Sequence, residues 1–155
     1  APTTREILEC NVAANDLSSQ VTVLPLAVGS ENGTIALHCS PEQGHSSFVE
    51  GEFVENGTTV DVQMMTLPTV LDERNIDQVD LLKIDIEGAE TDLFEGMTPD
   101  GWKRVKRVTM ETHDKLRPGA HDRVLAELKQ HGFEIHSELN QFGLGYINAY
   151  QAIAA

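Results

Sequence analysis

The stretch Leu81-Leu82-Lys83-Ile84-Asp85-Ile86-Glu87-Gly88 decides the fold. It ends a nearly continuous apolar run over residues 79–86, which is typical of a strand covered on both faces. Side chains alternate along a strand, so Lys83, Asp85 and Glu87 lie on one side and the apolar residues on the other. A buried Lys83 would need a carboxylate partner such as Asp85, because an unpaired buried charge is costly. In open α/β sheets ligands bind beyond the carboxyl ends of parallel strands, so the acids that end this strand are candidate site residues.

The next expected strand, residues 105–112, leads to a second pair of titratable side chains. Its end reads Thr109-Met110-Glu111-Thr112-His113, which again places Glu111 and His113 on one side. Two neighbouring strands therefore direct Asp85, Glu87, Glu111 and His113 toward one region. For each residue alone, an ion-pair network between strand ends and helix N-termini is an equal interpretation, and Glu87 and Glu90 would suit the helix dipole. For the four together, the pattern favours a function.

The flanking sequence predicts alternating helices and strands. Periodicity, capping residues and glycine stops predict helices at residues 3–14, 67–74, 89–95 and 120–131. Further strands are expected at residues 21–28, 34–39, 133–139 and 144–153, and a hairpin at 52–62 around Asn56-Gly57. The last two strands leave no room for a helix between them and must form an antiparallel pair. The fold class is therefore α/β with a mixed sheet.

Size and charge exclude several functional classes. The 155 residues, 40% of them apolar, can bury one core and predict a single domain. No apolar run approaches the about 18 to 20 residues of a membrane helix. Lys and Arg number 11 against 25 Asp and Glu, so the net charge of −14 argues against nucleic acid and anionic membranes as partners. The basic cluster at residues 102–107 is expected to balance nearby acids. Cys10 and Cys39 form no C-x-x-C pair, and the start shows no signal-peptide pattern, so a cytoplasmic location is expected.

The nine residues Leu82-Lys83-Ile84-Asp85-Ile86-Glu87-Gly88-Ala89-Glu90 resemble the signature of the FkbM-type methyltransferases. The resemblance covers nearly the whole chain, including residues 8–15, 21–33, 46–48 and 111–113. Pro68 departs from it, since the family tends to carry an acid there. The resemblance implies a Rossmann-like class I methyltransferase sheet with an antiparallel C-terminal hairpin. It also implies an enzyme that uses S-adenosylmethionine to methylate a small-molecule, sugar or lipid-like acceptor, most often on a hydroxyl oxygen.

The resemblance also implies roles for individual residues. His113 is the candidate base, since imidazole titrates near neutrality. Asp85 would position the methionine portion of the cofactor or the acceptor, and Glu111 would orient His113 or bind the acceptor. A divalent metal on these three catalytic residues is the less favoured alternative, and no metal is expected. The implied cofactor-binding residues are Ala27, Val28, Asp85 and Glu87, the first two near the adenine and the carboxylates near the sulfonium cation.

Two features of the class are missing from the sequence: a glycine-rich turn after the first strand, and a ribose-binding acid about 20 residues later. With the class order 3-2-1-4-5-7-6, we expect a sheet that lacks its first two strands, so that residues 21–28 and 79–86 are separated. Direct pairing of these strands, a homo-oligomer, or a missing N-terminal segment could complete the sheet; we favour a domain that is incomplete at its N-terminus. Such a chain would bind S-adenosylmethionine poorly. The alternatives are a non-catalytic methyltransferase-like interaction domain and, more distantly, a nicotinamide-dependent oxidoreductase.

Overall fold

The computed structural model describes residues 2–39, 46–47 and 58–151. The chain divides into two compact units, one made of Ala1–Ala27 and Gly33–Met64 and the other of Val28–Asn32 and Met65–Ala155. The single methyltransferase-like domain expected from the sequence stays a prediction. Across the described part of the chain, no helix combines the length and hydropathy needed to span a bilayer.

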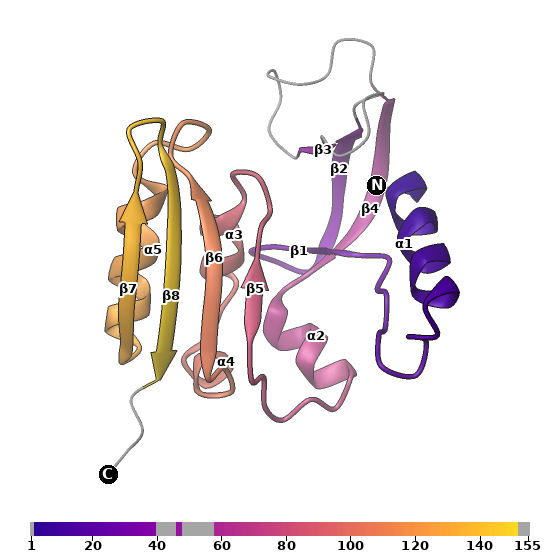
Figure 1. Ribbon diagram of the computed structural model, residues 1–155, viewed down its shortest axis with the longest axis horizontal. Helices are drawn as coiled ribbons and strands as arrows, with labels where there is room; N and C mark the ends of the chain where they lie inside the picture. Colours follow the sequence, from indigo (N-terminus) through magenta and orange to yellow (C-terminus); the bar gives the residue numbers. More distant parts are fainter. Residues whose placement is uncertain (1, 40–45, 48–57, 152–155) are drawn as a thin grey trace. The chain divides into compact units, whose positions relative to one another are not determined.

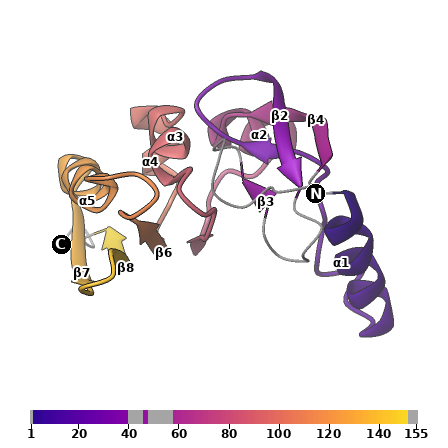
Figure 2. The same ribbon diagram turned by 90° about the horizontal axis from the view of Figure 1, so that it is seen from above.

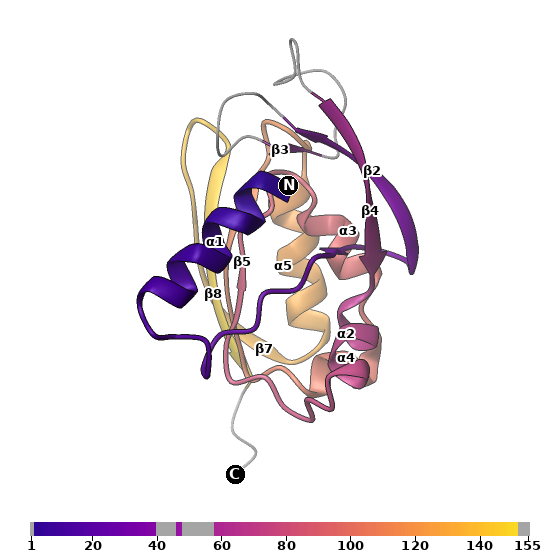
Figure 3. The same ribbon diagram turned by 90° about the vertical axis from the view of Figure 1, so that its right-hand side faces the viewer.

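The first sheet has the strand order β1-β4-β2-β3. Its long strands, β2 (Gly33–Cys39) and β4 (Thr58–Met65), pair antiparallel from Gly33↔Met64 to Cys39↔Thr58 and lie side by side in Figure 3. β3 (Ser46–Ser47) pairs with β2 and is a strand that the sequence did not predict. Of the hairpin predicted around Asn56-Gly57, only the second strand begins within the described residues, as β4; the turn and the first strand lie outside them.

The N-terminal helix is confirmed, but the strand predicted after it is mostly wrong. α1 spans Pro2–Ala14 and buries none of its residues. Of residues 21–28, only β1 (Ala27–Val28) is a strand. Apolar β-branched residues favour extended backbone, yet a strand forms only where a neighbour supplies hydrogen-bond partners. Within the described chain, the segment before Ala27 has no such neighbour.

The second sheet is mixed, as the sequence predicts. It contains β5 (Leu82–Ile84), β6 (Arg107–His113), β7 (Phe133–Leu139) and β8 (Leu144–Gln151), in the order β5-β6-β8-β7 (Figure 1). β5 and β6 are parallel, whereas β8 pairs antiparallel with both β6 and β7. The C-terminal hairpin is thereby confirmed.

Helices cover one face of this second sheet. α3 (Glu90–Glu95), α4 (Pro99–Lys103) and α5 (Ala120–Gln130) lie on the same side of its strands (Figure 2). Along β6, Val108, Met110 and Thr112 are buried beneath these helices, while the alternate residues face the other way. Trp102 from α4, which the sequence did not predict as a helix, is 1% exposed and lies edge-on to Phe94 at 4.9 Å. The face opposite the helices therefore carries the charged and titratable side chains of β6, Arg107, Glu111 and His113.

The strand predicted at residues 79–86 is shorter than expected and is covered on one face only. β5 spans three residues, and Val79 adds an isolated parallel bridge to Val105. Leu81 is 54% exposed, and the Lys83 side chain lies at the surface, so the expectation of a buried lysine is wrong. β5 stands at the end of the strand order and pairs with β6 alone among the described strands. The missing neighbour leaves the backbone of β5 open along one edge. Lys83 is exposed because it faces away from the helices that cover the other side of the sheet.

The remaining local predictions are largely confirmed. α2 spans Leu67–Glu73, with Pro68 in its first turn and Thr66 as N-cap, whose hydroxyl accepts a hydrogen bond from the Thr69 amide. α3 ends at Gly96 as expected. The basic cluster does pair with acids: Lys106 Nζ lies 2.7 Å from Asp80 Oδ1 and lowers the pKa of that carboxyl through their hydrogen bond.

Candidate functional site

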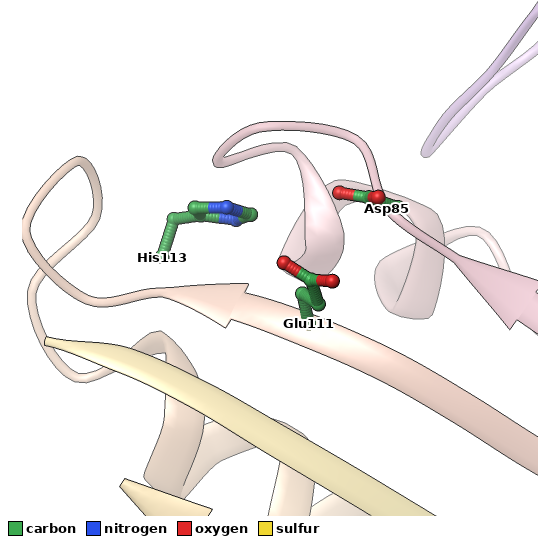
Figure 4. Close-up of side chains that lie close together, drawn as sticks. All are labelled: Asp85, Glu111 and His113. Atoms are coloured by element: carbon green, nitrogen blue, oxygen red, sulfur yellow. The ribbon is translucent and has the colours of Figure 1, made fainter. Parts of the chain in front are cut away.

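The parallel pairing of β5 and β6 brings three predicted residues together. Asp85 directly follows β5, Glu111 lies in β6, and His113 is the last residue of β6. Their side chains converge in Figure 4, and one nitrogen or oxygen atom from each lies within 4.8 Å of the others. Two strands that end at one edge of a sheet thus deliver three proton-accepting side chains to one place.

A tight turn after β5 adds further carboxylates to this group. Glu87 and Gly88 both have left-handed backbone conformations, with φ of 47° and 94°. A side chain at Gly88 would be strained there and would approach Leu116 to 3.2 Å. A non-glycine residue in this region is uncommon, and such conformations concentrate at functional sites. The turn places Glu90 at the start of α3, facing the end of β6.

His113 lies between two carboxylates. Its Nδ1 is 2.7 Å from Glu90 Oε1, and its Nε2 is 3.4 Å from Glu87 Oε2. The side chain of His113 is 14% exposed, that of Glu87 54% and that of Glu90 0%. The ring therefore makes a short hydrogen bond to a buried acid on one side and a longer contact to a solvent-facing acid on the other.

Glu90 is the site residue whose role the sequence did not reveal. The position of Glu90 in the sequence suggested only a charge that suits the end of a helix. In the structure the Glu90 side chain is fully buried, and its Oε1 also accepts a hydrogen bond from the Gly88 amide at 2.9 Å. Its Oε2 has no hydrogen-bond partner among the described residues. Membership of the Leu82–Glu90 motif was the only available signal, because burial of a carboxylate is a tertiary property. The imidazole is hydrogen-bonded to Glu90; the resemblance implied that Glu111 orients His113 or binds the acceptor, and that role stays a prediction.

The electrostatic character of the site is anionic. Asp85, Glu87, Glu90 and Glu111 contribute four carboxylates, and the nearby cation is Lys83, whose Nζ lies 3.3 Å from Asp85 Oδ2. Both side chains of that pair are about half exposed, so their interaction contributes less than about 1 kcal/mol. With a neutral histidine, the formal sum is 1 − 4 = −3. Such a group attracts a cationic ligand.

The residues expected near the adenine, Ala27 and Val28, form β1 and are half-buried. Their contact with a cofactor stays a prediction. Asp85 and Glu87, the other two expected cofactor residues, lie at the edge of the second sheet with exposed carboxylates.

Comparisons with known proteins identify the relatives of this chain. The family model described as "Methyltransferase FkbM domain" matches residues 1–135. Methyltransferase sdnD of Sordaria araneosa is 29% identical over 87% of this chain and 62% of its own length. The 31-O-demethyl-FK506 methyltransferase FkbM of Streptomyces tacrolimicus is 34% identical over 54% of this chain and 32% of its own length. Methyltransferase 1 of Beauveria bassiana is 28% identical over 94% of this chain and 59% of its own length. The chain thus spans less than two thirds of each relative, and no solved structure matches it.

Proposed function

Because the chain belongs to the FkbM methyltransferase family, we propose that it carries out S-adenosylmethionine-dependent methyl transfer to a hydroxyl oxygen of a small-molecule, sugar or lipid-like acceptor. Methyl transfer in general is the activity that the family and its named relatives share. One relative is named for a 31-O-demethyl substrate, which supports oxygen as the atom that is methylated.

The second sheet supports a Rossmann-like class I fold. Its order β5-β6-β8-β7, with one parallel and two antiparallel pairings, matches the 4-5-7-6 half of the class order 3-2-1-4-5-7-6. In that order the first strand would lie beside β5, which is an edge strand in the second sheet. An edge that continues a sheet is a site for strand addition. We therefore propose that further chain, from an N-terminal segment or from a second copy, completes this sheet.

The chemistry of the donor set fits a sulfonium cofactor. Asp85 and Glu87 present exposed carboxylates beside β5 in surroundings with a formal charge of −3. These two residues would hold the cationic part of S-adenosylmethionine. When bound, the cofactor would supply an activated methyl group for transfer to the acceptor oxygen.

We assign to His113 the role of general base, which removes the proton of the acceptor hydroxyl. Nδ1 of the ring is occupied by Glu90, which leaves Nε2 as the atom that can accept a proton. One carboxylate oxygen of Asp85 and one of Glu111 lie within 4.8 Å of a ring nitrogen of His113. The two carboxylates would hold the acceptor hydroxyl beside Nε2. Positioning and general-base assistance are the two contributions that such a displacement needs from the protein. The convergence of these three side chains is the observation that carries the proposal.

A substitution of His113 tests this function. The protein at its natural length is incubated with S-adenosylmethionine and a panel of hydroxylated sugars, lipids and small metabolites, and S-adenosylhomocysteine formation is measured. We expect His113→Ala to lower kcat by about 10²- to 10⁴-fold, since a general base contributes about that much. His136→Ala, at an exposed histidine stacked on Tyr150, serves as the matched control and should retain activity.

Two outcomes would contradict the proposal. Full kcat in His113→Ala would remove the base assignment. Absence of S-adenosylhomocysteine with every acceptor would favour the non-catalytic interaction domain.

A further inference from the structure

We propose that Glu90 is a positioning residue: it holds His113 in the tautomer that carries its hydrogen on Nδ1, so that Nε2 keeps the lone pair needed to accept a proton. This inference rests on the proposed role of His113 as base. It assigns to the buried Glu90 a task that neither its place at a helix end nor its charge alone would suggest.

The hydrogen bonds of Glu90 determine the direction of donation. When Glu90 is ionised its oxygens only accept hydrogen bonds, so in that state His113 Nδ1 donates to Oε1 across the 2.7 Å contact. The same Oε1 accepts the Gly88 amide hydrogen at 2.9 Å. That amide belongs to the turn in which Glu87 and Gly88 both adopt left-handed conformations. The strained turn after β5 therefore anchors the oxygen that orients the ring.

The backbone around His113 is held as firmly as the carboxylate. His113 pairs with Leu144 of β8, and its carbonyl accepts hydrogen bonds from the Leu116 and Arg117 amides, both at 2.9 Å. The Arg117 guanidinium binds both carboxylate oxygens of Asp92, at 2.6 and 3.1 Å. Asp92 lies in α3, the helix that begins with Glu90. This bidentate pair ties the segment after β6 to the helix that carries the positioning residue.

The arrangement also suits the charged form of the ring. When Nε2 takes the acceptor proton, the imidazolium lies 2.7 Å from Glu90 and 3.4 Å from Glu87, each contact made by a different ring nitrogen. The contact with Glu90 is shielded from water and so is the stronger of the two. Glu87, more than half exposed, can receive the new Nε2 hydrogen without fixing the resting tautomer.

Glu90→Gln reverses the hydrogen bond with little change of shape. The amide can donate to Nδ1, which favours the tautomer with hydrogen on Nε2 and removes the lone pair that accepts the proton. We expect kcat to fall by about 10²- to 10⁴-fold, the contribution of a general base, with KM for cofactor and acceptor little changed. Glu127→Gln is the matched control, because Glu127 also pairs with a histidine, His131 Nε2 at 3.1 Å, on α5.

The decisive measurement is the tautomer of His113 itself. Long-range ¹H–¹⁵N correlation spectra are recorded on the ¹⁵N-labelled chain at about pH 9, where imidazoles are ordinarily neutral, and the His113 signals are assigned by their loss in His113→Gln. The unmodified protein should show hydrogen on Nδ1, Glu90→Gln should shift it to Nε2, and Glu127→Gln should leave it unchanged.

Each outcome is decisive. Hydrogen on Nε2 in the unmodified protein overturns the inference even if Glu90→Gln does not fold, and so does a folded Glu90→Gln enzyme with unchanged kcat. The spectra need no cofactor or acceptor. The two failures can therefore be distinguished: the spectra report a failure of positioning, and the His113→Ala assay reports a failure of methyl transfer.

Discussion

At the scale of single residues, the same three side chains could support two different kinds of chemistry. Asp85, Glu111 and His113 could ligate a divalent cation or could hold and deprotonate a hydroxyl group. Lys83 favours the second, because its ammonium group lies 3.3 Å from Asp85 and competes with a metal ion for that carboxylate. In the proposed mechanism, Lys83 therefore neutralises the carboxylate of Asp85 in place of a metal ion. Nε2 of His113 accepts the proton of the acceptor hydroxyl.

Metal removal tests this choice. We expect dialysis against a chelator to leave kcat unchanged within about twofold, because no step assigned to these residues needs a metal ion. The measurement is S-adenosylhomocysteine formation before and after chelation, with Mg²⁺ and Mn²⁺ then added back. Loss of activity on chelation with recovery on one of these ions would assign the three side chains to a metal centre instead.

At the scale of elements, the β7–β8 hairpin shows how register places polar partners. Glu134 and Tyr150 are opposite each other in the ladder, and the Tyr150 hydroxyl donates to Glu134 Oε2 at 2.7 Å. This hydrogen bond, together with the negative charge of Glu134, raises the pKa of Tyr150 above its usual value. The pair faces solvent on the side of the sheet that the helices leave uncovered.

The alkaline titration of Tyr150 tests this register. A group whose pKa is raised on folding contributes stability that is fully present below the unfolded value, about pH 10, and lost as pH rises through the folded value. In a Tyr146→Phe background, the tyrosinate absorbance of Tyr150 should therefore rise at higher pH than in the same background with Glu134→Gln. Superimposable curves would show that this cross-strand hydrogen bond does not form in solution.

At the scale of the whole molecule, the proposed cofactor site depends on two features: β5 ends the strand order of the second sheet among the described strands, and the sequence contains no glycine-rich turn of the class. The class holds its cofactor through a turn that this sequence does not contain, and the chain spans 62% of the length of one relative and 59% of another. The acids beside β5 supply attraction to a cation but not the contacts of the turn. The binding site for S-adenosylmethionine is therefore proposed to need further chain.

Calorimetry on the isolated chain tests this expectation. Titration with S-adenosylmethionine should give a dissociation constant weaker than about 10⁻⁴ M, which corresponds to a binding free energy smaller in magnitude than about 5.5 kcal/mol. Asp85→Asn should weaken it further if the carboxylate attracts the sulfonium. Micromolar affinity in the unaltered chain would contradict the proposal that the cofactor site is incomplete.

The amino-acid sequence by itself determined the elements whose signals are local. Pro68 was compatible with the first turn of α2, Gly96 predicted the end of α3, and the short spacing before Leu144 predicted the antiparallel hairpin, because stops and turns depend on residues a few positions apart. The alternation of side chains along a strand is also a local pattern, and it placed Asp85, Glu111 and His113 on one side of their strands.

Only the tertiary structure decided features that depend on a distant partner. Residues 21–26 and 79–81 carry strand-forming side chains but lie outside the strands, since a ladder needs a neighbour that no local pattern supplies. Lys83 is exposed because it lies on the side of the sheet that the helices leave uncovered. The burial of Glu90 against His113 depends on a helix and a strand 23 residues apart meeting at one point, and burial is what turns an ordinary acid into the group that orients the proposed base.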